Sequence, residues 1–188
     1  MYGASFDNGI DKTGDNHILK FYLESINDEF LPQTDENMLK TSCEKLVDIV
    51  FNPLIENNEF KNEYVEQEKE NIKRIIEGKT DNKARYAFDR CVEEMYKDKP
   101  YGLYKYGYLE DLESITAKEL YKHYKKIISE CKIDIFISGI VDNKAIKFIE
   151  ENKNIKALNP RKNNVVINSL EPKEKVEKKE VKEEMDVT

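Results

Sequence analysis

Hydrophobic residues recur at helical spacing in residues 63–98, the most regular stretch of the chain. In its first half, apolar side chains follow one another at steps of three, four and seven residues, which lines them along one face of a helix. The members of this face are Val65, Ile72, Ile75 and Ile76. The opposite face is rich in glutamate, lysine and arginine, as expected for a solvated surface. Gly78 suits the C-terminal cap of this helix.

A second helix is predicted directly after the first, with Asp81 as its N-cap residue. Its buried stripe is predicted to consist of Ala84, Phe88, Cys91 and Val92. Two amphipathic helices that pack on a core account for the whole pattern. The periodicity of residues 63–98 therefore indicates no functional site by itself.

Residues 1–31 are predicted to form a β-hairpin. Strand-prone segments at 2–6 and 18–23 flank residues 12–15, which contain a glycine and have the composition of a turn. His17 falls just after this turn. A lone histidine at a strand end is far more often a surface residue than a ligand, so we expect His17 to be exposed.

The next predicted helix opens at Thr34 and buries apolar residues between Met38 and Phe51. Pro53 stops it, because proline cannot continue the hydrogen-bond ladder of a helix. Residues 54–60 are predicted to be a connecting loop that leads into the helix pair.

Residues 99–108 combine two glycines, one proline and four tyrosines, which predicts a turn-rich connector with aromatic anchors. Rigid amphipathic rings suit a binding surface, for which Tyr101 and Tyr104 are the candidates. Aromatic residues more often cover a core beneath a loop, and we favour that interpretation.

The second half of the chain is predicted to begin with a helix that Thr116 caps and that runs through residue 130. His123 lies one step off the apolar stripe of this helix and is expected at its edge. Residues 132–138 alternate well enough to predict a strand that ends at a glycine. Asp142 then starts a short helix that ends near residue 152.

This order of elements predicts an α+β domain over residues 1–158, with a mainly antiparallel sheet and helices packed on it. From residue 159 the composition changes. Residues 165–167 are strand-prone, but residues 171–188 are nearly all charged. Such a run cannot bury enough apolar surface to offset chain entropy, so residues 159–188 are predicted to be a charged linker or tail.

Composition narrows the classes of partner. The net charge of −7 gives no long-range attraction to phosphate backbones or anionic lipid, so neither nucleic acid nor membrane is an expected partner. No apolar run approaches a membrane span, and the N-terminus does not have the pattern of a signal peptide. The chain has three cysteines, an odd number, and they are widely spaced without a CxxC pair. This pattern predicts reduced thiols in a cytoplasmic protein.

Four segments occur in an order and at spacings that resemble the insulinase/pitrilysin family of zinc metallopeptidases, the inverzincins: VEQEKENIKRII, DNKARYAFDRCVEEM, KPYGLYKYGYLEDLESITAKELYKHYKKI and IDIFISGIVD. The resemblance covers most of residues 1–142. It implies a LuxS/insulinase-like half-domain, incomplete at its N-terminus, from a bacterial protein whose full form carries a second copy of the fold after the linker.

Catalysis in this family requires a His-x-x-Glu-His run, in which two histidines bind zinc and the glutamate acts as general base. The chain has only His17 and His123, too far apart in sequence for that motif. In the family the run precedes the hairpin placed here at residues 1–31. The resemblance therefore implies that the chain begins downstream of the motif.

A third zinc ligand in the family, a glutamate, stands seven residues after the glutamate of a Glu-Arg/Lys pair. If that pair is Glu68–Lys69, the ligand position is Ile75, which cannot bind zinc. A different register, counted from Glu70, leads to Glu77. We favour the first register, because it places Ile72 and Ile75 on the apolar face.

These observations leave three hypotheses. The leading one assigns no catalytic, cofactor-binding or metal-binding residues to the chain, whereas the second makes Glu77 a candidate zinc ligand. The leading one is a non-catalytic domain that binds no cofactor and helps an active subunit, or the second half of its own longer chain, to enclose a peptide. The second is an active zinc peptidase whose histidine motif lies upstream. The third is an acidic protein-interaction module that uses the tyrosine-rich connector at residues 99–108 (the tyrosine loop) and the charged tail. Because upstream elements of the family's sheet are expected to be missing, the isolated chain is expected to expose an unpaired strand edge and to self-associate.

Overall fold

A computed structural model describes residues 3–31, 37–97, 99–158, 180 and 182 of the chain. The strands are β1 (Ser5–Thr13), β2 (Asn16–Glu24), β3 (Ile55–Glu56) and β4 (Glu59–Phe60). The helices are α1 (Met38–Phe51), α2 (Asn62–Glu77), α3 (Lys83–Met95), α4 (Leu109–Ser114), α5 (Ala117–Glu130), α6 (Asn143–Glu151) and α7 (Lys153–Lys156). Short 3₁₀ turns stand at Asp28–Phe30, Gly78–Thr80 and Pro100–Gly102. The predicted strand at 165–167 and the predicted tail lie outside the described residues, apart from residues 180 and 182.

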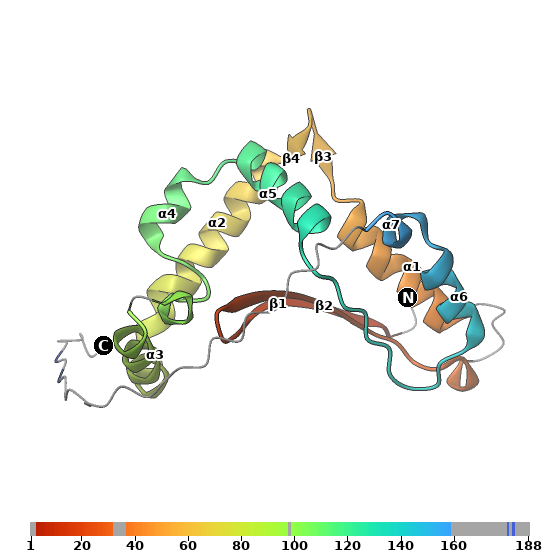
Figure 1. Cartoon of the computed structure of the whole chain (residues 1–188), viewed down its shortest axis with the longest axis horizontal. Coiled ribbons are helices and arrows are strands. Elements are labelled where there is room, and N and C mark those ends of the chain that lie inside the picture. The colour runs from red at the N-terminus through yellow and green to blue at the C-terminus, as the bar shows by residue number, and fades with distance from the viewer. Residues whose placement is uncertain (1–2, 32–36, 98, 159–179, 181, 183–188) are drawn as a thin grey trace.

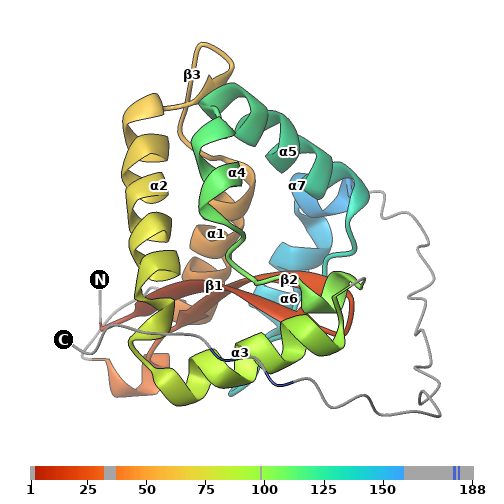
Figure 2. The ribbon, with the colours of Figure 1, turned by 90° about the vertical axis from the view of Figure 1, so that its left-hand side faces the viewer.

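The arrangement is an arch of helices over a long hairpin (Figure 1). β1 and β2 pair antiparallel from Ser5 opposite Glu24 to Thr13 opposite Asn16, which confirms the hairpin predicted for residues 1–31. Helices α1, α6 and α7 gather at one side of this hairpin, and α2, α3 and α4 gather at the other. Helix α5 and the tip formed by β3 and β4 join the two groups at the top. In the turned view, α3 runs along the base beside the hairpin (Figure 2).

The structure mixes helices and antiparallel strands, consistent with the predicted α+β class, but helices dominate it. The sheets of the described residues are two separate two-stranded hairpins, β1–β2 and β3–β4. The strands pair antiparallel as predicted, but in the described residues they form two small separate sheets instead of one larger sheet. Two strands alone are marginally stable in water, so the long hairpin depends on the helices and loops that contact it.

Helix starts follow local chemistry closely. Thr116 caps α5 and Asp142 caps α6, as predicted, and Gly78 ends α2. The N-cap of α3 is Asn82 instead of the predicted Asp81, and its side chain accepts a hydrogen bond of 3.0 Å from the Arg85 amide. Helix α1 begins at Met38 with Asn37 as its cap, whereas the predicted start at Thr34 lies outside the described residues.

The loop predicted at residues 54–60 is a small hairpin instead. Its two turn residues, Asn57 and Asn58, have φ values of 51° and 65°. Two consecutive left-handed residues match the twist of a two-residue hairpin turn, and asparagine tolerates this conformation better than other residues with a side chain. The Asn-Asn pair is the sequence signal that the loop prediction overlooked.

The buried face of α3 differs from the predicted stripe. Ala84, Phe88 and Cys91 are exposed, with 57% of Phe88 open to solvent, and only Val92 is half-buried. The half-buried residues of this helix are mostly polar or aromatic: Tyr86, Asp89, Arg90, Glu93 and Glu94. Helix α3 is amphipathic, as predicted, but its apolar side faces away from the rest of the described chain.

The strand predicted at residues 132–138 does not form a ladder. The segment runs from α5 to α6 without pairing to any described strand. Alternation fixes which side chains share a side of an extended segment, but a strand also needs a neighbour with free backbone groups. That neighbour is absent among the described residues.

Burial is sparse throughout the described chain. Apart from Gly102, its buried residues are Met38, Val65, Ala117 and Ala145, and no large side chain is fully enclosed. The three cysteines are free, as predicted. Among the described residues, no helix combines the length and the apolar character that crossing a membrane requires. The apolar content of the sequence therefore does not close into a core within these residues.

The tightest backbone approach gives a direct test of the packing. A methyl group at buried Gly102 would stand 2.2 Å from the Tyr96 carbonyl oxygen. We therefore expect Gly102→Ala to lower the free energy of unfolding by about 1–3 kcal/mol, because the backbone must move to relieve the clash. Urea unfolding measures this change. Gly9→Ala is the control, since its methyl group meets no atom within 4 Å. Equal loss of stability in both variants would contradict the packing described here.

Candidate functional site

The residues that the sequence singled out as possible metal ligands lie apart and face solvent. His17 is on β2, opposite Lys12, and is exposed as predicted. His123, predicted at the edge of the apolar stripe of its helix, is exposed on α5. Glu70 and Glu77 are exposed on α2. Among the described residues, no three histidine, cysteine or carboxylate side chains come close enough together to hold a metal ion.

Ile75, at the favoured ligand position, is 42% exposed. The side of α2 that faces the molecule consists of Val65, Lys69, Ile72 and Ile76, spaced by four, three and four residues. The expectation that Ile75 shares the covered face with Ile72 is therefore wrong. The reason is geometric: residue 75 lies about 100° around the helix from residue 76, and only the latter points inward.

Lys69, the basic member of the candidate Glu-Lys pair, has a structural role. Its ammonium group donates to the carbonyl oxygens of Glu113 at 3.4 Å and Ile115 at 3.2 Å, and it forms an ion pair with Glu66 at 3.3 Å. Only 19% of its side chain is exposed. Lys69 thus binds backbone oxygens at the C-terminal end of α4, where a positive charge is favourable, and it ties α2 to α4.

The acidic residues of α2 make local contacts on its surface. Glu68 accepts a hydrogen bond of 3.2 Å from the Asn71 amide group, and Glu70 lies 3.9 Å from Arg74. Glu77 is the last residue of α2. The carbonyl end of a helix carries partial negative charge, which disfavours a carboxylate there and gives it no preorganised partner.

A largely covered ion-pair cluster joins α3 to the 3₁₀ turn Gly78–Thr80 that precedes it. Lys79 pairs with Glu93 at 2.5 Å, and Arg90 pairs with the other oxygen of the same carboxylate at 2.7 Å. The Lys79 ammonium also lies 4.2 Å from the centre of the Tyr104 ring. Burial of Glu93 opposes its ionisation, but the hydrogen bonds from Lys79 and Arg90 outweigh it and hold the pKa of this carboxyl below its ordinary value. This is a satisfied ion-pair cluster without an open position for a ligand.

The tyrosine loop packs on the hairpin through Lys12. The ammonium of Lys12 donates to the carbonyl oxygens of Pro100 at 3.0 Å, Tyr101 at 2.7 Å and Leu103. Burial lowers the pKa of Lys12, while the nearby carboxylates of Asp15 and Glu93 raise it in part. Sequence reasoning missed this contact, because a single lysine in a strand gives no signal of a partner nearly ninety residues away.

Ring contacts confirm that the tyrosines of this loop cover the structure beneath them. Tyr101 meets Tyr96 edge to face at 4.9 Å, and Tyr104 meets Tyr106 at 5.7 Å. Tyr101, Tyr104 and Tyr106 are half-buried, whereas Tyr108 is exposed. The packing interpretation favoured from the sequence therefore holds for three of the four rings.

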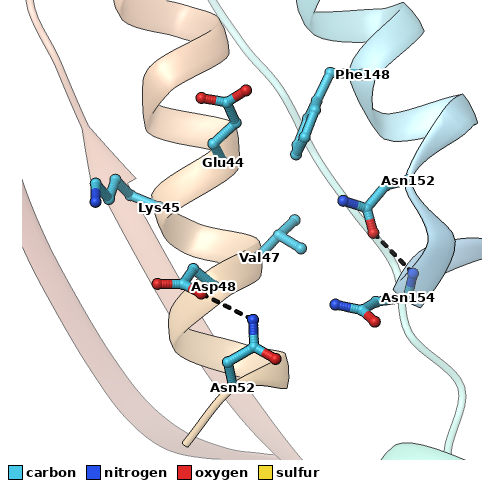
Figure 3. A pocket seen from close by; sticks show the side chains of 8 residues that line it. All are labelled: Glu44, Lys45, Val47, Asp48, Asn52, Phe148, Asn152 and Asn154. Atoms are coloured by element: carbon cyan, nitrogen blue, oxygen red, sulfur yellow. Dashed lines mark hydrogen bonds between the residues drawn. The ribbon is translucent and has the colours of Figure 1, made fainter.

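Two shallow grooves lie along α1, α6 and α7. The first has a volume of about 310 Å³ and is lined in part by Glu44 of α1. In Figure 3, Val47 of α1 and Phe148 of α6 project into the space between the helices. Asn152 and Asn154 line its far side. The second, of about 550 Å³, carries four lysines at its rim: Lys40, Lys144, Lys147 and Lys153. The residues that line the two grooves include no serine, threonine, cysteine or histidine, so neither groove contains the paired nucleophile and base of covalent catalysis.

The contact of Lys69 with α4 is open to a direct test. We expect Lys69→Met to lower the free energy of unfolding by about 1–2 kcal/mol, because two carbonyl oxygens lose their charged donor. Lys73→Met on the exposed side of the same helix is the matched control and should change stability little. Denaturant titrations of both variants provide the measurement, and an unchanged midpoint for Lys69→Met would refute the structural role.

Known proteins resemble this chain both in sequence and in structure. No family model matches the chain. The chain is 33% identical over 147 residues to a protein of Bacillus subtilis (strain 168) named "Probable inactive metalloprotease YmfF", an alignment that covers 78% of this chain and 34% of that protein. It also resembles a solved structure, "Crystal structure of a conserved protein from Enterococcus faecalis V583", with a TM-score of 0.61 and 29% identity over 69% of this chain and 30% of that one. The chain thus spans about a third of the length of these two proteins, and it is homologous to a protein that is named an inactive metalloprotease.

Proposed function

We propose that this chain is a non-catalytic domain of an insulinase/pitrilysin-type protein, with the half-domain fold of that family. Its role is to form part of the wall that encloses a peptide beside an active zinc peptidase. The order of the four sequence segments supports the family, and the name of the Bacillus subtilis relative supports the loss of catalysis.

The observation that carries the proposal is the residue at the ligand position. Ile75 replaces the glutamate that the family uses as its third zinc ligand, and an isoleucine side chain has no atom that binds a metal. Zinc supplies both the Lewis acid and the activated water of such peptidases. A chain with isoleucine at this position provides neither through α2.

The register that takes Glu68–Lys69 as the family's pair is supported by Lys69 and not, as expected from the sequence, by Ile75. Lys69, not Ile75, shares the inward face of α2 with Ile72. In the proposal, Glu68 and Lys69 remain the counterpart of the family's pair, and the lysine has kept a purely structural contact with the end of α4. The other register depends on Glu77, an exposed residue at the end of the helix where the dipole disfavours a carboxylate.

A partner surface is part of the proposal. Phe88 and Met95 lie on the outward side of α3 and are 57% and 67% exposed. An apolar helix face open to solvent suits burial against another unit. We propose that a related peptidase subunit, or the second half of the protein's own longer chain, covers this face. The interaction-module alternative loses its main support, because Tyr101 and Tyr104 already pack within the described chain.

Peptide hydrolysis tests the proposal. The full chain, incubated with zinc and an unbiased peptide mixture, is expected to produce no cleavage that a chelator suppresses, because the chain holds no activated water. Mass spectrometry of the peptides is the measurement. Cleavage that is blocked by a chelator and abolished by Glu77→Gln, but retained in the control Glu70→Gln, would overturn the proposal and favour an active peptidase in the second register.

A further inference from the structure

The segment between α5 and α6 has the backbone of a strand without a partner. The last backbone hydrogen bond of α5 is donated by the Cys131 amide to the Ile127 carbonyl oxygen, and the next begins at the Asp142 carbonyl oxygen. Between them, residues 132–141 form no backbone hydrogen bond to any described residue. Free amide and carbonyl groups in a row are a template for pairing with another strand.

The side chains of this segment fit a strand with one apolar side. Ile133 and Ile137 are half-buried, and Ile135 between them is 44% exposed. On the other side Phe136 is 92% exposed. The two charged residues, Lys132 and Asp134, pair with each other at 2.9 Å and so neutralise one another. The edge therefore has neither a proline nor an uncompensated charge to repel an incoming strand.

The edges of the hairpin differ from this segment in a useful way. β1 carries Asp7, Asp11 and Lys12, and β2 carries Lys20 and Glu24. Charged side chains along an edge are the usual protection against pairing with another chain. Residues 132–138 are thus the unprotected strand edge of the described chain.

We propose that two copies of this chain associate through residues 132–138, paired antiparallel about a two-fold axis at Ile135. In that register Ile135 faces its own copy, Ile133 faces Ile137, and Lys132 faces Ser138. All three isoleucines then meet isoleucine on one side of the ribbon, and no like charges stand opposite each other. A two-fold interface must be self-complementary in this way, which is the reason to commit to a second copy as the occupant.

The charges and the alternation of this segment also disfavour neighbouring registers. Centring the pairing one residue earlier would place Asp134 opposite Asp134 and would cost stability through direct repulsion. Shifting the register by one residue on one copy would place isoleucines on the side of the polar residues. The charges therefore disfavour the register centred at Asp134, and the alternation disfavours registers offset by one residue.

Two charge-matched variants of the full chain test the proposal by analytical ultracentrifugation over a range of concentrations. Ile135→Lys places two lysines opposite each other and is expected to weaken dimerisation by at least about tenfold. Phe136→Lys adds the same charge one residue away, but places it opposite Asp134 of the second copy. It is expected to leave the dimer intact or to tighten it. Both positions are substantially exposed, so the monomer accommodates either lysine. A chain that stays monomeric at all concentrations, or equal effects of the two variants, would overturn the proposal.

Disulfide cross-linking fixes the register independently of affinity. In a background with Cys43, Cys91 and Cys131 changed to serine, Ile135→Cys places two thiols together at the two-fold axis and is expected to cross-link under mild oxidation. Ser138→Cys is the control, because its two copies stand about 20 Å apart at roughly 3.4 Å per residue. Cross-linking of both variants or of neither would show that the copies associate elsewhere, with residues 132–138 left to another segment or protein.

Discussion

Lysine side chains that reach backbone carbonyl oxygens hold distant parts of this chain together. Lys12 joins the hairpin to the loop after α3, and Lys69 joins α2 to the end of α4. Such contacts matter here because the described residues include only four buried side chains, those of Met38, Val65, Ala117 and Ala145, which are too few for apolar packing to fix the arch of helices. The long aliphatic stem of a lysine can cover apolar surface while its ammonium group makes a charged hydrogen bond, so one side chain can serve both purposes.

An arch held by polar contacts leaves apolar surface open, and this openness connects the fold to the proposed function. The outward side of α3 presents Phe88 and Met95, and the segment before α6 presents Phe136. Exposed apolar side chains of this kind suit burial against another protein surface. A non-catalytic part of a larger enclosure needs such surfaces more than it needs a reactive centre. The most prominent charged cluster described above is already satisfied, because the carboxylate of Glu93 is paired with Lys79 and Arg90.

The sequence predicted what depends on neighbouring residues and failed on what depends on distant ones. The caps Thr116 and Asp142 and the hairpin of residues 1–31 follow from local chemistry, and the structure confirms them. The buried side of α3 and the position of Ile75 depend on what each helix packs against, which periodicity alone does not reveal. The strand at 132–138 failed for the same reason, since alternation does not supply a partner. In the candidate site, the absence of the histidine run was readable directly, whereas the anchoring role of Lys69 was visible only in three dimensions.

The zinc content of the purified full chain decides whether α2 contributes to a metal site. Native mass spectrometry after incubation with zinc and desalting compares the chain with its Glu77→Gln variant. We expect less than one retained zinc per chain in both proteins, because Ile75 and the exposed carboxylates of α2 form no ligand set. One tightly held zinc per chain that disappears in Glu77→Gln would contradict this expectation, and would identify α2 as part of a working metal site.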